Sequence, residues 1–177
     1  MNLIEPPLDC TFIYDSYACR SGKGVHAAVD RYQGWARRYP YALKMDLAQY
    51  FPSIDHDILK DKLRRPIKDE RVIELLNRIS DTSPMVEGPI RYFPGDNLFT
   101  PLTHRTGIPI GNLTSQFFAN LYRDDLDRCL KETPAVTAYL RYVDDMVVLD
   151  DDKDRLADIR AAVAEGLEQQ RLRLHPR

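Results

Sequence analysis

The chain has 177 residues, of which 44% are hydrophobic and 29% charged, and this composition excludes an intrinsically disordered protein. No stretch approaches the roughly 20 consecutive apolar residues of a membrane helix, and the N-terminus lacks the basic and apolar regions of a secretory signal. The formal net charge of −2 gives no overall sign of a nucleic-acid binder, and three widely spaced cysteines without a CxxC pair indicate neither a zinc site nor a disulfide framework. We expect one cytoplasmic domain with its own core.

The first forty residues predict one helix after an irregular start. Residues 1–20 read as irregular, because Pro6-Pro7 bars regular structure there. Residues 21–24 (SGKG) form a turn signal, and apolar residues at helical spacing then predict a helix over 25–36. Pro40 ends it, and a buried strand is expected over 41–47.

The middle of the chain predicts helices and one long connection. Two short helices are expected near 55–64 and 69–80, and residues 82–108 are rich in Pro, Gly and Thr, which indicates an irregular segment. Residues 112–130 predict a long helix. Its expected inward-facing side chains are Leu113, Phe117, Leu121, Leu126, Cys129 and Leu130.

The last part predicts a hairpin and a helix. Strands over 137–143 and 146–150 flank an acidic turn, a helix follows over about 153–170, and 171–175 is a possible last strand. The order strand, helix, strand, strand, helix is that of the ferredoxin-like split βαβ fold, an antiparallel sheet with two helices on one face. The expected class is α+β.

Charge is unevenly distributed. Residues 20–38 carry five basic side chains and one acidic one, and residues 60–78 carry seven and four. Acidic residues gather at 124–127 and 144–154. A basic face beside an acidic pocket suits a polyanionic substrate at a metal site, although helices with basic solvated faces look similar.

Three carboxylates are predicted to meet at one edge of the sheet. In the split βαβ arrangement the first strand lies beside the hairpin, so Asp46 comes next to Asp144 and Asp145. Such carboxylates repel each other unless cations neutralise them, and their hard oxygens suit Mg²⁺. Asp144-Asp145 alone would read as a solvated turn.

Three segments resemble the reverse transcriptase family: residues 43–54 (LKMDLAQYFPSI), 107–120 (GIPIGNLTSQFFAN) and 142–145 (YVDD). The resemblance covers roughly residues 14–177. It implies a right-hand polymerase palm and RNA-templated DNA synthesis from deoxynucleoside triphosphates, on an RNA template with a DNA or RNA primer. It also implies two Mg²⁺ ions, with Mn²⁺ as a substitute.

The resemblance assigns roles to individual residues. Asp46, Asp144 and Asp145 match the metal-binding catalytic triad, and the Leu47 carbonyl matches a backbone metal ligand. Phe51 matches the aromatic gate against a ribose 2′-OH, with a core aromatic as the alternative. The resemblance also implies contacts to the nucleotide from Ile110, Gly111 and Gln116. It implies contacts to nucleic acid or its phosphates from Arg20, Lys23, Arg141 and Tyr142. Arg141 and Tyr142 are expected to position the hairpin or primer rather than to take part in the chemistry.

Two departures from the family pattern bear on the subtype. Most members carry Gln before the glycine of the 107–111 turn and Ser-Pro after it, whereas this chain has Ile110-Gly111 and Ser115-Gln116. Together with residues 16–28 (SYACRSGKGVHAA), this is similar to the error-prone enzymes of diversity-generating retroelements, which implies a small basic accessory protein. Ile110 could instead simply pack in its turn. A retron, group II intron or unclassified bacterial enzyme is the alternative, and a bacterial or phage origin is expected.

The resemblance also divides the chain. Residues 1–40 correspond to part of the fingers, and 41–177 to the palm, with fingers-type helices and a loop inserted at about 55–106, all within one reverse transcriptase domain. The first fingers motif and the thumb are expected to be absent. The chain could therefore be an inert palm fragment that acts as a nucleic-acid-binding or partner-dependent module.

Overall fold

The computed structural model describes residues 4–82, 91–109, 111–134 and 136–176. In chain order, the elements within these ranges are α1 (Glu5–Asp9), α2 (Val25–Ala36), β1 (Tyr41–Met45), α3 (Tyr50–Ser53), α4 (His56–Arg64), α5 (Glu70–Asp81), α6 (Thr100–Thr103), α7 (Leu113–Glu132), β2 (Ala138–Tyr142), β3 (Asp145–Asp150) and α8 (Lys153–Gln169). None of these helices has the length and apolar character that a membrane crossing requires.

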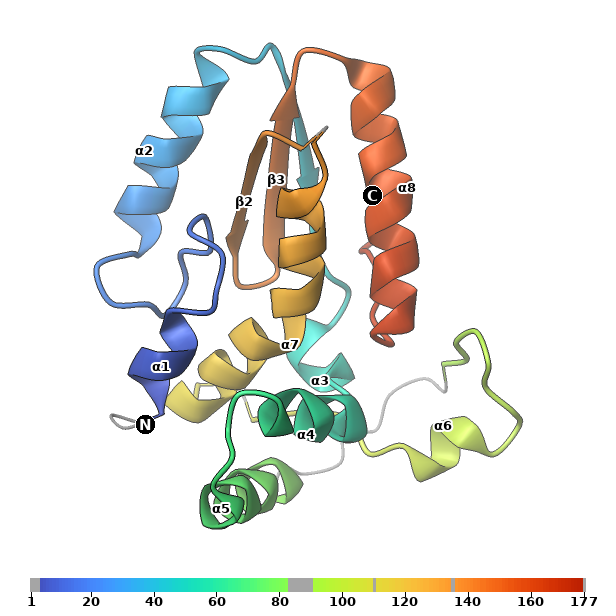
Figure 1. Ribbon diagram of the computed structural model, residues 1–177. Coiled ribbons are helices and arrows are strands. Elements are labelled where there is room, and N and C mark those ends of the chain that lie inside the picture. Colours follow the sequence, from blue (N-terminus) through green and yellow to red (C-terminus); the bar gives the residue numbers. More distant parts are fainter. Residues whose placement is uncertain (1–3, 83–90, 110, 135, 177) are drawn as a thin grey trace.

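The three strands form one antiparallel sheet in the order β1-β3-β2 (Figure 1). Side chains alternate between its two faces. Met146 and Val148 of β3 belong to the main core, which α7 and α8 cover. Leu149 points the other way and packs with Ala28 and Trp35 of α2. Around β2 and β3 the sheet is therefore covered on both faces, with two helices on one and α2 on the other (Figure 1). Most of β1 is exposed, so the expectation of a buried strand there is wrong for all but its last residue, Met45.

The order β1, α7, β2, β3, α8 is the split βαβ arrangement, so the α+β class expected from the sequence is confirmed. The helices α4, α5 and α6 are inserted between β1 and α7 and lie below the sheet (Figure 1). Within this insertion α4 packs against α7, and α5 packs against α4.

Acidic and amide caps explain where four of the helices begin. The Asp55 carboxylate accepts hydrogen bonds from the backbone N–H groups at the start of α4, and Asp69 does so for α5. Asn112 caps α7 and Asp152 caps α8 in the same way. Each cap satisfies N–H groups that have no partner within the helix. These helices lie within two residues of the positions that the sequence predicts.

Three expectations about the irregular segments are wrong. The segment around Pro6-Pro7 forms the short helix α1, because proline is tolerated in the first helical turn, where its missing N–H costs nothing. A second short helix, α6, lies within the segment expected to be irregular. The possible strand at 171–175 is instead a single antiparallel bridge between Leu47 and Leu174.

Candidate metal and nucleotide site

The strand register brings the three predicted carboxylates to one edge of the sheet. β1 pairs with β3 up to Met45 opposite Met146, so Asp46 follows directly beside the start of β3. Tyr142 pairs with Asp145, which leaves Val143 and Asp144 as the two residues of the hairpin turn. The predicted neighbourhood of Asp46 and the Asp144-Asp145 turn is thus present in the fold.

The hairpin turn holds a strained residue. Val143 has φ +54°, in the left-handed region that a β-branched side chain rarely adopts. Such a conformation costs about 1–3 kcal/mol and persists only when its surroundings impose it. Here the Arg141 Nη1 group donates a hydrogen bond of 3.0 Å to the Val143 carbonyl and so holds the peptide unit that precedes Asp144.

Arg141 anchors the hairpin from inside the core. Its side chain is 1% exposed, as is that of Asp127 on α7, and Nε donates to Asp127 Oδ2 at 2.6 Å. Asn120 Oδ1 accepts a second bond from Arg141 at 3.0 Å, and the other Asp127 oxygen accepts from the Tyr139 hydroxyl at 2.6 Å. Burial by itself would lower the pKa of Arg141, but the nearby Asp127, Tyr50 and Tyr139 side chains together outweigh it and raise that pKa, so the guanidinium stays charged.

The carboxylates repel each other in the way that a cation site requires. The pKa of Asp144 is raised, first by partial burial and then by the charges of Asp46 and Asp145. Asp145 also lies 2.9 Å from the Lys44 Nζ atom, in a half-exposed ion pair. Three hard-oxygen donors with mutual repulsion fit Mg²⁺ or Mn²⁺. The chemistry of these donors fits the expected metal centre, and the role of Asp46, Asp144 and Asp145 as metal ligands stays a prediction.

The Leu47 carbonyl points to the side where the hairpin lies. On the opposite side, the Asp46 carbonyl accepts from the His175 N–H at 2.8 Å, and the Ala48 N–H donates to the Arg173 carbonyl at 2.9 Å. Backbone groups alternate in direction along an extended segment, so the groups of Leu47 face away from this C-terminal segment. This direction suits the role of backbone ligand that the sequence predicts.

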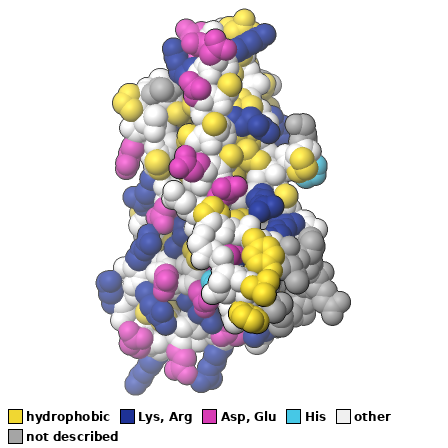
Figure 2. Space-filling model, turned by 90° about the vertical axis from the view of Figure 1, so that its right-hand side faces the viewer, with side chains coloured by type: hydrophobic (Ala, Val, Ile, Leu, Met, Phe, Trp, Pro, Cys, Tyr) yellow, Lys and Arg dark blue, Asp and Glu magenta, His cyan; other side chains and the backbone are white. Residues whose placement is uncertain are grey.

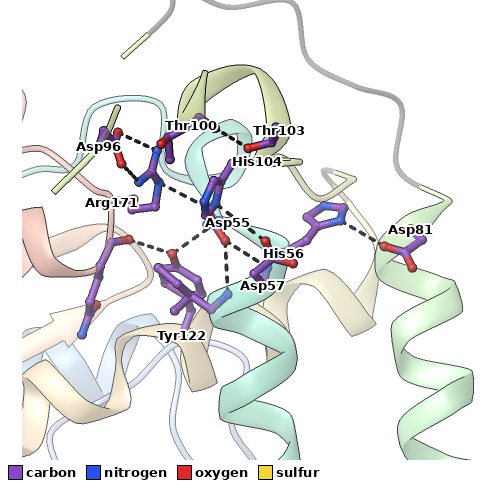
Figure 3. Close-up of polar contacts among 12 residues, drawn as sticks. Asp55, His56, Asp57, Asp81, Asp96, Thr100, Thr103, His104, Tyr122 and Arg171 are labelled. Atoms are coloured by element: carbon purple, nitrogen blue, oxygen red, sulfur yellow. Dashed lines mark hydrogen bonds and ion pairs between the residues drawn. The ribbon is translucent and has the colours of Figure 1, made fainter. Parts of the chain in front are cut away.

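A second acidic group, not identified from the sequence, lies on the inserted part of the fold (Figure 3). Among the described residues, Asp55, Asp57 and His104 have ligand atoms within 4.8 Å of one another. Asp55 is fully buried, its Oδ2 lies 2.5 Å from His104 Nδ1 and 3.3 Å from Arg171 Nε, and it caps α4. Because hydrogen-bond donors and a guanidinium already surround Asp55, a cation bound to this group would have to displace those partners.

The expected nucleotide-binding residues lie on segments that pair with each other. The Ile108 N–H donates to the Phe51 carbonyl at 3.1 Å, which joins the 107–109 segment to α3. Phe51 is half-buried against the core. Gly111 has φ +88°, which favours glycine, and Gln116 Oε1 accepts from the Cys19 thiol at 3.0 Å. Ile110 lies outside the described residues.

Most of the expected nucleic-acid contacts are engaged within the chain. Arg20 is 8% exposed, with Nε 2.6 Å from an Asp9 carboxylate oxygen. The Lys23 ammonium lies 3.2 Å from the centre of the Tyr14 ring. Arg141 is buried as described, and Tyr142 is half-buried. Arg20 and Arg141 therefore act on the structure of the chain itself, whereas contacts with nucleic acid stay a prediction for all four residues.

The raised pKa of Asp144 leads to a prediction for the metal-free chain. A carboxyl group whose pKa is higher in the folded than in the unfolded state destabilises the fold once pH rises above its unfolded value, about 3.9. Asn carries no charge, so Asp144→Asn should raise the melting temperature in EDTA at pH 7, and the difference from wild type should disappear near pH 3. Thermal melts across pH measure this. A variant that melts at or below the wild-type temperature at pH 7 would argue against the repulsion.

Comparison with known proteins gives the family. The model of the family described as "Reverse transcriptase (RNA-dependent DNA polymerase)" matches residues 2–177. Two curated relatives are each 26% identical over 129 residues, which is 73% of this chain. They are the "Uncharacterized 91 kDa protein in cob intron" of Schizosaccharomyces pombe and the "Putative COX1/OXI3 intron 2 protein" of Saccharomyces cerevisiae. The chain spans only 15% and 14% of their lengths. Both come from eukaryotes and lend no support to a bacterial or phage origin.

The fold has a solved counterpart. The structure of apo telomerase from Candida tropicalis matches with a TM-score of 0.59 and 14% identity, over 91% of this chain and 32% of that chain. At this identity the likeness concerns the fold, which it shares over nearly the whole chain. The family model spans the whole site described above. The chain belongs to the reverse transcriptase family.

Proposed function

We propose that this chain carries the catalytic palm of an enzyme that performs RNA-templated DNA synthesis. The observation that carries the proposal is the β1–β3 register, which sets Asp46 beside the Asp144-Asp145 turn. The raised pKa of Asp144 supports it further, because the charges of Asp46 and Asp145 contribute to that rise. The template would be RNA, the primer DNA or RNA, and the substrates deoxynucleoside triphosphates.

Asp46, Asp144, Asp145 and the Leu47 carbonyl would hold two Mg²⁺ ions, with Mn²⁺ as a substitute. Bound there, the ions supply charge stabilisation and activation of the attacking hydroxyl in phosphoryl transfer. The chain's own contribution is to fix the direction of its ligands. The Val143 carbonyl is held by Arg141, β1 is paired with β3, and Leu47, two residues after β1, is bridged to Leu174. Ligands on such supported backbone lose little entropy when the site fills.

The nucleotide would lie over the segment that follows β1. Phe51 is assigned as the gate that crowds a ribose 2′-OH, and Ile110, Gly111 and Gln116 as the surface below the base and sugar. The hydrogen bond between the Phe51 carbonyl and the Ile108 N–H supports this assignment, because Ile108 belongs to the same predicted motif as Ile110 and Gly111. Tyr142 and Lys23 are assigned to the primer or template, with Arg20 and Arg141 supporting them from within the fold.

The experiment is primer extension on an RNA template with Mg²⁺. Wild type is compared with an Asp144→Asn/Asp145→Asn variant and with Asp151→Asn, an exposed acid on the loop before α8. Extension by wild type and Asp151→Asn, but not by the double variant, supports the proposal. Identical traces for all three chains would remove the enzymatic function and leave an inert module that binds nucleic acid or a partner.

The subtype has two candidates. Ile110-Gly111, Ser115-Gln116 and residues 16–28 favour a diversity-generating retroelement, in which copying is error-prone and a small basic accessory protein takes part. The names of the two curated relatives favour an intron-encoded enzyme instead. An amide at position 110 could hydrogen-bond the incoming nucleotide, which isoleucine cannot do.

Sequencing the cDNA made by wild type and by Ile110→Gln separates these candidates. A lower error frequency at template adenines in the variant supports the retroelement reading. An unchanged error spectrum would contradict the proposed role of Ile110, and the intron reading would then stand.

A further inference from the structure

A short loop of the inserted region displays hydrophobic side chains to solvent. Tyr92, Leu98 and Phe99 are 45%, 70% and 67% exposed. Hydrophobic side chains gather in the lower half of the face seen in Figure 2, directly below a group of basic ones. A cluster of large exposed apolar groups is uncommon on a monomer and indicates a binding surface.

The loop is held in shape by its own polar contacts. Asp96 forms two ion-pair bonds with Arg171, at 2.5 and 3.0 Å, and also accepts from the Phe93 N–H at 2.9 Å (Figure 3). Asn97 Oδ1 accepts from the Phe99 N–H at 2.9 Å. These contacts fix the turn while its apolar side chains stay outside. The surface is therefore preorganised, which lowers the entropy cost of binding.

Two arginines tie this loop to residues 48–53, the segment that follows Asp46 and Leu47 and includes α3. The Arg91 guanidinium donates to Gln49 Oε1 at 2.5 Å and to Ser53 Oγ at 3.1 Å, at the start and end of α3. Arg173 donates to the Tyr92 carbonyl at 2.8 Å, while its own carbonyl accepts from the Ala48 N–H. A ligand on the loop would thus lie beside the segment that leads out of Asp46.

The charge around the loop is positive. Arg91 precedes Tyr92 in the chain, Arg173 donates to the Tyr92 carbonyl and lies over the ring of Phe93, and the acidic Asp96 is already neutralised by Arg171. Exposed aromatic rings interleaved with cations are the surface on which unpaired bases stack while the backbone phosphates are neutralised.

We propose that the loop over residues 92–99 is a stacking platform for an unpaired strand of RNA. The identity of that strand as the template rests on the proposed function. The stacking itself requires only Tyr92 and Phe99, and the exposed Leu98, which precedes Phe99 in the chain, adds apolar surface. Neither metal ion nor nucleotide is needed for it.

The test is fluorescence anisotropy of a labelled single-stranded RNA with the full chain, in EDTA and without nucleotide. Phe99→Ala and Tyr92→Ala should each weaken RNA binding about 10-fold, because the stacking of one base on one aromatic ring typically changes affinity by about that factor. Phe99→Tyr keeps a ring and should bind like wild type. Leu75→Ala is the matched control, since Leu75 is 57% exposed on α5 and should leave binding unchanged.

Equal affinity of wild type, Phe99→Ala and Tyr92→Ala would overturn the platform. The proposal would also be overturned if Leu75→Ala weakened RNA binding by the same factor. It would likewise be overturned if Phe99→Ala and Tyr92→Ala lost binding to anionic lipid vesicles while their RNA binding stayed intact. The melting temperature of each variant is measured to check that the variant is folded. The Asp144→Asn/Asp145→Asn variant should bind this RNA as wild type does, so failure of the platform and failure of the catalytic site give different results.

Discussion

Arg141→Met is expected to lower the free energy of unfolding by about 3–5 kcal/mol, because it leaves the buried Asp127 carboxylate without its cation. Of the hydrogen bonds that the Asp127 carboxylate accepts from described residues, the one from the Tyr139 hydroxyl would remain, and Asn120 Oδ1 and the Val143 carbonyl would lose a donor. The expected effect is large because both partners of the ion pair are 1% exposed. Urea unfolding at neutral pH measures it.

Two controls separate burial from charge. Arg78→Met removes an exposed ion pair with Glu74 on α5 and should cost no more than about 0.5 kcal/mol. Arg141→Met combined with Asp127→Leu removes both charges and should recover a large part of the loss. If Arg141→Met and Arg78→Met unfold at the same urea concentration, the buried pair does not hold the hairpin.

Asp46→Asn is expected to slow nucleotide incorporation by at least about 100-fold, since even partners that only orient a metal ligand contribute 10–100-fold. The Asn side chain keeps the shape of Asp46 but lacks the charge that hard divalent cations need. Asp46 is the informative position because it lies far from Asp144 in the sequence and meets it only through the β1–β3 register. Single-nucleotide incorporation on an RNA template gives the rate.

The matched control is Asp61→Asn. Asp61 is an exposed acid on α4 and forms an ion pair with Arg64, one turn further along the same helix. Its rate should equal that of wild type. If Asp46→Asn retained the wild-type rate, the assignment of β1 to the metal site would be wrong, even if Asp144→Asn were inactive.

The sequence predicts the frame of the site well, for physical reasons. Apolar runs at strand spacing mark β1 and the hairpin, and the order of elements leaves one antiparallel arrangement in which Asp46 meets Asp144. Asp55, Asp69, Asn112 and Asp152 mark helix starts through local hydrogen bonds. Both signals lie within short stretches of sequence.

The interior of α7 could not be predicted in the same way. Leu113 and Cys129 were expected to face inward but are exposed, whereas Asn120, Arg123 and Asp127 are buried. Helical periodicity assigns burial by hydrophobicity, so it misplaces polar residues such as Asn120 and Asp127, which find their partner on another element. Here Arg141 arrives from β2 and pairs with Asp127, a contact that no local pattern reveals.

The contacts around Asp55 could not be predicted from the sequence, for a related reason. His104, Arg171 and Asp96 converge on or near Asp55 from three separate segments (Figure 3). No motif links these residues in the sequence. Their meeting depends on the inserted region folding back against the segment after α8, and this segment also carries Leu174, which is bridged to Leu47.

Manganese binding followed by electron paramagnetic resonance tests the central claim most directly, because it asks which carboxylates hold the metal. The account predicts that Asp46→Asn and Asp144→Asn each remove or strongly weaken Mn²⁺ binding, while Asp57→Asn, in the other acidic group, leaves it unchanged. Binding that survives both Asp46→Asn and Asp144→Asn but is lost in Asp57→Asn would contradict the account and place the metal at Asp55, Asp57 and His104.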